Sequence, residues 1–437
     1  MKRSDKGLYL YCLALILVYL FVTFTGRSVP QPVRLAYLVL YFLPVLQDST
    51  WCVAAMSIPM ILMRYGGGSG LDTGGLLPSH NEVYLFVAIV ISMLKADLRA
   101  NKIPLVLFLF LLWSSFIDMI FDSSGIFILL LESSILLMIV FAAYDKREES
   151  LSKFCYLWIC ATFALSICFI YLRSNSDQYV VDLSIGESRQ GWMDPNYFGT
   201  VLGMGAICAF IELQRNRQLM LFVKVLYIAT IAITVIALLY NASRGAILAL
   251  AISGTILLLY VKIKPIYKAL VIGIVVGFLY YLYTNDVMNI LIYRLENDDR
   301  TGNRWIIWAD KSADFFLNYN PLHWLMGVGN SEVIKLGGSQ SNFLSVHNDF
   351  LSIFFQYGIV GFILFIKLLF HPIYEAFRKK ESVVYVLSAT AYLSTVLFTL
   401  NPISGGQFPY FLFVFYIYAL GAEAKSVKLQ NSLYNVR

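Results

Sequence analysis

The sequence predicts an all-α polytopic membrane protein, and three features of its 437 residues support this prediction. Hydrophobic residues make up 59% of the chain and charged residues only 14%, with a mean hydropathy of +0.70. Long apolar runs recur along most of the chain, and the basic residues fall in short groups between them. Since a water-soluble domain carries about one-quarter charged residues, lipid is the solvent that fits this composition.

A membrane-spanning helix needs about twenty apolar residues, and each run must close its own backbone hydrogen bonds as a helix. The run at 7–25 follows three basic residues, as in a signal peptide, but no small-residue cleavage site comes after it. We therefore expect an uncleaved first helix and about fourteen spans in all, the count being least defined between residues 35 and 94. The expected spans are 7–25, 35–46, 51–63, 83–94, 103–121, 126–144, 154–172, 197–211, 219–240, 245–261, 269–283, 350–370, 383–400 and 408–420.

The positions of the basic residues predict the orientation in the membrane. With the N-terminus in the cytoplasm, about two-thirds of the 33 lysines and arginines fall on the cytoplasmic side. Both termini are then cytoplasmic, and residues 173–195 and 284–346 form external loops of one integral membrane domain over residues 1–437. Short basic groups between apolar runs do not favour nucleic acid as a partner.

The loop at 284–346 is the longest polar stretch of the chain, and loops of this size usually carry function. Ile306, Ile307, Phe315 and Phe316 indicate an amphipathic helix at the membrane interface within it. Ahead of that segment stand Arg300 and Arg304, the latter in the sequence Thr-Gly-Asn-Arg-Trp. A charged group of this kind is either a solvated face or part of a site.

Two further arginines precede expected helices on the external side. Arg244 follows Asn-Ala-Ser and opens the run at 245–261, where it either snorkels to the interface or holds an anion. A helix N-terminus with a guanidinium suits phosphate oxygens. Arg189 precedes the sequence Asp194-Pro-Asn196, in which the aspartate or the asparagine caps a helix with proline in its first turn.

His347 lies in the sequence Val-His-Asn-Asp-Phe, at the start of the strongly apolar run at 350–370. A histidine at such a place is either structural or a proton acceptor for a hydroxyl, with a carboxylate such as Asp349 to orient it. Asn348 stands between the two residues. We find no zinc motif, Walker loop, dinucleotide fingerprint or nucleophile elbow, so the sequence suggests no metal, nucleotide or redox cofactor.

The order of these elements is more specific than any one of them. An arginine with Asp-Pro-Asn-Tyr-Phe-Gly, then Ser-Arg-Gly at 243–245, Thr-Gly-Asn-Arg-Trp at 301–305, Gly-Val-Gly at 327–329 and His-Asn-Asp-Phe-Leu at 347–351 resembles the O-antigen polymerase and ligase superfamily. The resemblance covers residues 184–361, while the earlier spans match only as generic membrane helices.

This resemblance implies a glycosyltransferase with a GT-C-like architecture in the bacterial inner membrane, acting on the external side without cofactor or metal. Its donor and acceptor are undecaprenyl-pyrophosphate-linked glycans, with membrane lipids around it and a chain-length regulator and a flippase as implied partners. Arg244 and Arg304 are then expected to stabilise the departing pyrophosphate, with His347 as the base. Arg189, Asp194, Asn196, Arg300, Asn348 and Asp349 are expected to bind substrate.

Three functions stay open on the sequence. A polymerase extends a lipid-linked chain, and a ligase moves the finished glycan onto lipid A-core. Both share these motifs, and we favour the polymerase because such enzymes often carry two arginine-bearing external loops. A polysaccharide flippase would also have about fourteen helices but should place its cations inside the helix bundle.

Overall fold

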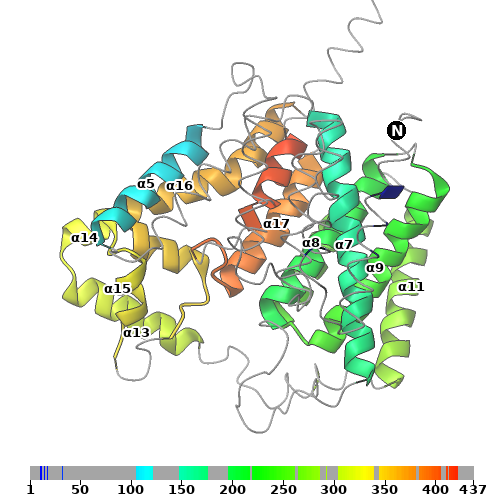
Figure 1. Cartoon of the computed structure of the whole chain (residues 1–437), viewed down its shortest axis with the longest axis horizontal. Helices are drawn as coiled ribbons and strands as arrows, with labels where there is room; N and C mark the ends of the chain where they lie inside the picture. The colour runs from blue at the N-terminus through cyan, green and yellow to red at the C-terminus, as the bar shows by residue number, and fades with distance from the viewer. Residues whose placement is uncertain are drawn as a thin grey trace, which may run out of the picture. The chain divides into compact units, whose positions relative to one another are not determined.

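The structure is a computed structural model. It describes residues 105–121, 147–175, 195–216, 219–260, 264–285, 304–338, 344–379, 383–404, 410–411 and 413–421, together with Leu10, Tyr11, Ala14, Leu17, Pro32 and Ile292. All regular secondary structure in these residues is helical, which confirms the all-α part of the prediction (Figure 1). The chain divides into two compact units, residues 1–96 with 146–292 and residues 97–145 with 293–437.

Where the structure describes them, the predicted spans lie mostly on helices, although the one at 350–370 is interrupted at Gly358. The helices of the first unit are α7 (Arg147–Asn175), α8 (Pro195–Arg215), α9 (Leu221–Asn241), α10 (Arg244–Tyr260) and α11 (Pro265–Thr284). Those of the second unit are α5 (Leu105–Phe121), α13 (Arg304–Asn318), α14 (Pro321–Met326), α15 (Asn330–Lys335), α16 (Asp349–Lys379) and α17 (Val383–Thr399). Most of the expected first four spans, and all of the one at 126–144, lie outside the described residues.

Three of the described helices are long and apolar enough to cross a membrane: Asn196–Arg215, Leu221–Asn241 and Asp349–Arg378. Shorter apolar stretches occur at Leu109–Phe121, Cys155–Tyr171, Arg244–Tyr260, Val275–Thr284 and Val383–Thr399. These helices support a membrane protein. The count of about fourteen spans stays a prediction.

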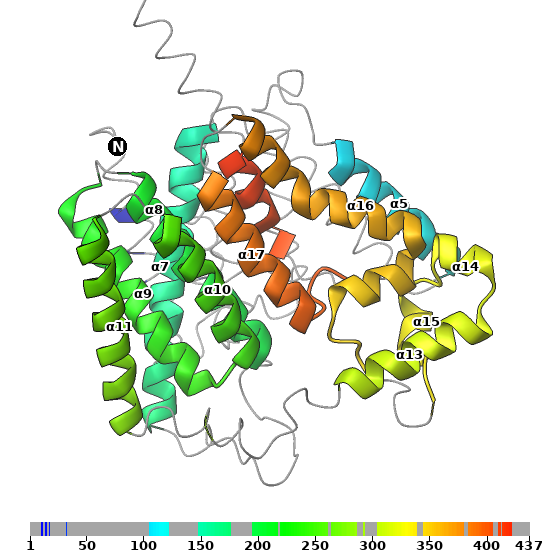
Figure 2. The same cartoon turned by 180° about the vertical axis from the view of Figure 1, so that it is seen from behind.

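The first unit has its core between α7, α8 and α9. Large side chains such as Trp158 of α7 are fully buried there, and small polar groups join the helices, as in the contact of 3.2 Å between the hydroxyls of Ser166 and Thr234. Such short hydroxyl contacts let apolar helices approach closely. Leu282 of α11 packs on the end of α9, beside Leu239 and Ala242, and Figure 2 shows α11 running along α9.

In the second unit, the described part of the segment predicted as a long external loop is mostly helical. It contains α13, α14 and α15, which gather at the N-terminal end of α16 (Figure 1). Helix α13 confirms the predicted helix around residues 306–316. Two of the four residues that predicted it, Ile307 and Phe315, face the core of this unit, while Ile306 and Phe316 are exposed.

Helix α16 differs from the uninterrupted span that we expected at 350–370. It begins at Asp349, ends at Lys379 and is broken at Gly358, whose φ of 64° and ψ of −168° are not helical. Only glycine adopts this conformation without steric cost. The first part of α16, Asp349–Tyr357, is therefore a short helix in its own right.

Candidate active site

The predicted site residues fall into both units. Arg244 and Asn196 belong to the first unit, and Arg304, His347, Asn348 and Asp349 belong to the second. The roles of all these residues remain predictions. Arg189, Asp194 and Arg300 lie outside the described residues.

In the first unit, a tight turn joins α9 to α10 and places Arg244. Ala242 caps α9 in the left-handed conformation, with φ at 52° and its N–H donated to the Leu239 carbonyl over 3.1 Å. The carbonyl of Ser243 then accepts the N–H of Ile247 at 3.1 Å, the first bond of the next helix. Arg244 is thus the first residue of α10, as its position in the sequence predicts. The residue is half-buried.

Helix α8 packs directly against this turn at Gly199. A Cβ atom on Gly199 would lie only 2.8 Å from both the Asn241 Nδ2 atom and the Ser243 Cβ atom. The sequence Asp-Pro-Asn-Tyr-Phe-Gly therefore touches the sequence Asn-Ala-Ser-Arg, although about forty residues separate them. The structure brings together two motifs that the sequence could only place in order.

This contact puts the first turns of α8 and α10 side by side. Asn196 precedes Gly199 by three residues and is half-buried, like Arg244. The positive ends of two helix dipoles and one guanidinium together favour an anion such as phosphate. The Ser243 hydroxyl is fully buried beside them, and no hydrogen-bond partner is found for it in the described structure.

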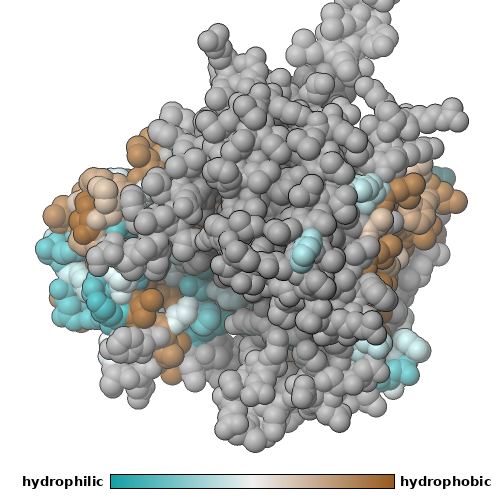
Figure 3. Space-filling view, in the orientation of Figure 1, coloured by the Kyte–Doolittle hydropathy of each residue, from teal (hydrophilic) through white to brown (hydrophobic). Residues whose placement is uncertain are grey.

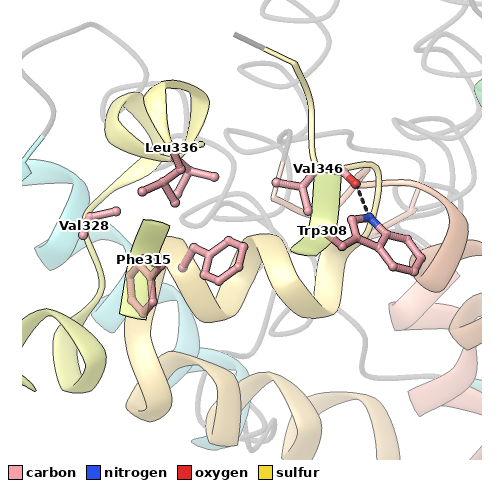
Figure 4. Close-up of a cluster of buried hydrophobic side chains, with 7 residues drawn as sticks. Trp308, Phe315, Val328, Leu336 and Val346 are labelled. Carbon is pink, nitrogen blue, oxygen red and sulfur yellow. Dashed lines mark hydrogen bonds between the residues drawn. The ribbon is translucent and has the colours of Figure 1, made fainter. Parts of the chain in front are cut away.

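In the second unit, α13 begins at Arg304 and is fixed to the segment before His347. Trp308, one turn after Arg304, donates its indole Nε1–H to the Val346 carbonyl over 2.7 Å (Figure 4). Trp308 and Val346 belong to a buried cluster with Phe315, Val328, Val333, Leu336 and Phe355. Arg304 lies one turn before Trp308 on the same helix face, and His347 directly follows Val346, so this bond joins the two segments that carry them.

His347 has a strained backbone. Its φ of 49° lies in the left-handed region, which is uncommon for residues other than glycine and is concentrated at functional sites. Asn348 follows as the cap of α16: its Oδ1 accepts the Leu351 N–H at 3.2 Å, and its carbonyl accepts the Ser352 N–H at 2.9 Å. The left-handed turn places the half-buried imidazole directly ahead of a capped helix.

Asp349 is fully buried and anchors the start of α16. Its two carboxylate oxygens accept the backbone N–H groups of Ile403 and Ser404, each at 2.8 Å, and its own N–H is donated to the Leu400 carbonyl at 2.9 Å. Both oxygens thus bond to the segment that follows α17. We expected this carboxylate to bind substrate and orient His347; its contacts indicate a structural support beneath the His347 turn.

The break in α16 gives the Gly-Val-Gly sequence a structural explanation. Val328 and Gly329 donate their N–H groups to the carbonyls of Phe355 and Gln356, both over 3.0 Å. A Cβ atom on Gly327, whose φ is 94°, would lie 2.1 Å from the Gln356 carbonyl oxygen. The segment 327–329 therefore packs against the backbone of α16 at the Gly358 break. Its N–H groups bond to carbonyls that have no partner within the helix.

Helix α5 also contacts α16 at the break, through hydrogen bonds to Tyr357, the residue before Gly358. The Trp113 Nε1–H is donated to the Tyr357 carbonyl over 2.8 Å, and the Tyr357 hydroxyl donates to the Asp118 Oδ2 atom over 3.2 Å. Asp118 is fully buried. Sequence reasoning missed this pair, although a carboxylate within the apolar run at 103–121 was a signal for it, since acidic residues in membrane helices usually have a specific role.

Lys311 is a second residue that the sequence did not single out. It is fully buried, and its Nζ donates to the carbonyls of Val333, Ile334 and Leu336 at 3.0, 3.2 and 2.8 Å, at the end of α15. An ammonium at a helix C-terminus is favoured by the helix dipole. Burial lowers the pKa of this amine from its usual value, against the opposing effect of neighbouring Asp310 and Asp314.

The apolar helices and these polar helix ends define a helical membrane protein with a structured, arginine-bearing loop. Residues 228–366 match the family model described as O-Antigen ligase. The match includes Arg244, Arg304, the Gly-Val-Gly segment and His347, and it confirms the chain's resemblance to the O-antigen polymerase and ligase superfamily. Members of the matched family are glycosyltransferase-like enzymes. No curated protein matches the sequence.

Proposed function

We propose that this protein is a membrane glycosyltransferase that polymerises undecaprenyl-pyrophosphate-linked oligosaccharide repeat units of a surface polysaccharide. The observation that supports the proposal is the hydrogen bond between Trp308 and the Val346 carbonyl, because it joins the helix that begins at Arg304 to the segment that precedes His347, both within the matched residues. Transfer from a lipid pyrophosphate requires a cation and a base.

The donor is activated before it reaches the enzyme. The bond between its anomeric carbon and the pyrophosphate oxygen breaks, and the electron pair leaves with the lipid pyrophosphate. Arg304 and Arg244 are the cations proposed to stabilise this growing negative charge, with Arg189 as a further contributor. Preorganised positive charge that acts mostly in the transition state raises the rate of transfer.

The acceptor hydroxyl forms the new glycosidic bond. Its oxygen attacks the anomeric carbon from the face opposite the leaving group, and the imidazole of His347 takes its proton. Inversion at that carbon follows, without a covalent intermediate and without a metal. The buried anchors at Asn348 and Asp349 hold His347 at the N-terminus of α16.

The wider architecture belongs to the same proposal. About fourteen spans in a GT-C-like arrangement would place both termini in the cytoplasm and the loop at 284–346 on the external face of the bacterial inner membrane. A flippase that delivers the repeat units and a chain-length regulator are the partners that such a polymerase needs. Reporter fusions after His323 test this topology, and a cytoplasmic readout there would contradict it.

Ligase activity is the second candidate, and the description of the matched family model as O-Antigen ligase favours it. A ligase would use the same cations and base but would pass a finished glycan to lipid A-core. The glycan species in a strain that lacks the protein separate these functions. Single repeats on lipid A-core indicate a polymerase, long glycans left on the lipid pyrophosphate indicate a ligase, and loss of translocated repeats indicates a flippase.

The residue assignment is tested by Arg304→Ala, His347→Ala and Arg244→Ala. We expect each variant to insert in the membrane at the wild-type level and to lose glycan transfer. Arg378→Ala is the matched control, since this arginine is exposed near the other end of α16 and forms a 3.9 Å ion pair with Glu375. A wild-type distribution of glycan chain lengths in any of the three variants would remove that residue from the site.

A further inference from the structure

Helix α13 uses one face for the interior of its unit. Ile307, Trp308, Lys311 and Phe315 are buried on this face, and the helix places its charged groups on or beside it. At its border, the carboxylates of Asp310 and Asp314 accept the N–H groups of Gly338 and Gly337 at 2.8 and 2.7 Å. The charged side chains in the middle of α13 therefore serve contacts within the protein.

The outward face of α13 is apolar throughout. Its residues follow one another at the spacing of three or four that lines one side of a helix. We name these six exposed residues the α13 apolar stripe: Trp305, Ile306, Ala309, Ala313, Phe316 and Leu317. The exposed fraction reaches 62% for Trp305 and 81% for Leu317. A helix that faced water would carry its charges here, so the polarity of α13 is the reverse of a water-exposed helix. Figure 3 shows hydrophobic and hydrophilic residues together at the visible surface of this region.

The position of α13 indicates what covers the stripe. The helix packs across the ends of two apolar helices: the Trp308 ring lies 5.5 Å from that of Phe398 near the end of α17, and the Phe315 ring lies 5.0 Å from that of Phe355 in α16. The stretch Asp349–Arg378 of α16, with its break at Gly358, is long and apolar enough to cross a membrane. The boundary of the bilayer falls where such helices end, so the stripe lies at that depth.

The apolar surface continues into the next helix. Leu322 and Leu325 of α14 are exposed, and the His323 ring between them lies 5.9 Å from the Phe121 ring at the end of α5. The described face of α5 that leads away from this contact exposes Leu112, Phe116 and Met119. An exposed apolar row along a membrane helix is the surface that lipid covers.

We infer that the α13 apolar stripe lies in the boundary between the headgroups and acyl chains of the membrane, with lipid as its partner. Trp305 then occupies the interfacial level that tryptophan prefers. The depth of α13 in the membrane is then fixed. One face of this helix, which carries Arg304 at its start, contacts the bilayer, and the other face contacts the segment before His347. This inference concerns the surface alone and is tested without glycan transfer.

The test uses the full-length protein in vesicles of phosphatidylcholine with brominated acyl chains, which quench only tryptophans that reach lipid. The Trp305 contribution is the difference between the wild type and Trp305→Phe. We expect brominated lipid to remove about half or more of that difference, as for an interfacial indole. Leu317→Asp, which puts a charge in the stripe, should reduce this quenching about twofold or more, whereas Leu317→Met should leave it unchanged.

Two other results would overturn the inference. If aqueous iodide but not brominated lipid quenches the Trp305 contribution, the stripe faces water. If neither agent quenches it, protein covers the stripe, and the covering surface is another segment of the chain or a second copy. Both readouts come from Trp305→Phe, a conservative change at an exposed position, so neither depends on a variant that fails to fold.

Discussion

The Trp308 indole donates its Nε1–H to the carbonyl of Val346 over 2.7 Å, across thirty-eight residues of sequence. This bond connects the helix that begins with Arg304 to the residue that precedes His347. Trp308 and Val346, the two residues that form the bond, belong to one hydrophobic cluster. The bond therefore joins the helix that carries the proposed cation to the segment that carries the proposed base.

Trp308→Phe tests that bond. Phenylalanine keeps an aromatic ring near Phe398 but cannot donate to the Val346 carbonyl, which is left buried without its partner at a cost of about 1–3 kcal/mol. We expect slower glycan transfer with a modest fall in the melting temperature in detergent. Trp305→Phe, at the exposed neighbour, should change neither quantity, and equal turnover in both variants would contradict the positioning role.

Asp349→Asn tests the anchor beneath the His347 turn. The amide retains one acceptor, but its NH₂ group faces a backbone N–H, so we expect a loss of about 1–3 kcal/mol in the free energy of unfolding. Chemical unfolding in detergent measures this loss. Glu375→Gln makes the same chemical change in α16 at a loose ion pair and should stay within about 0.5 kcal/mol of the wild type.

Gly358→Ala tests the break in α16. The new Cβ would lie 2.3 Å from the Leu325 carbonyl oxygen, at a φ of 64° that alanine disfavours. We expect little folded protein in membranes. Gly277→Ala is the matched control, because nothing lies within 4 Å of its Cβ position in α11, and it should stabilise by about 0.5–1 kcal/mol. Normal yield of Gly358→Ala would show that the break is dispensable.

Lys311 predicts a pH dependence of stability. Its folded-state pKa lies below the usual value, so the unfolded chain binds more protons between these two pKa values. The contribution of this amine to the free energy of unfolding therefore rises as the pH increases through that window. The difference in melting temperature between the wild type and Lys311→Met, followed from neutral to alkaline pH, should shift in favour of the wild type. A difference that stays constant with pH would contradict the shifted pKa.

Ser243→Ala separates a structural role of this hydroxyl from a functional one. The group is buried and no described residue bonds to it, so its removal should leave stability unchanged or raise it by about 1 kcal/mol. If the hydroxyl donates to a phosphate oxygen of the donor, glycan transfer falls in the same variant. Ser253→Ala, at a buried position deeper in α10, should leave transfer intact. A variant with wild-type transfer would remove Ser243 from the anion site.

The sequence predicted the helices better than their contacts. Runs of apolar residues placed α8, α9, α10 and α17 to within a few residues, because each membrane helix satisfies its own backbone and needs no partner to be recognised. The break at Gly358 was missed for the opposite reason: its carbonyls are satisfied by Val328 and Gly329, which lie far away in sequence. A local sequence pattern cannot predict a partner that is so far away in the sequence.

The candidate site shows the same division. Composition, charge and motif order determined by themselves that this is a helical membrane protein with Arg244, Arg304 and His347 at helix ends. Only the tertiary structure decided that Gly199 lies against the Ser243 turn, that Trp308 ties Arg304 to the His347 segment, and that Asp349 supports α16. The physical reason is that helix formation depends on neighbours along the chain, whereas these contacts depend on side chains and carbonyls that meet only after the helices pack.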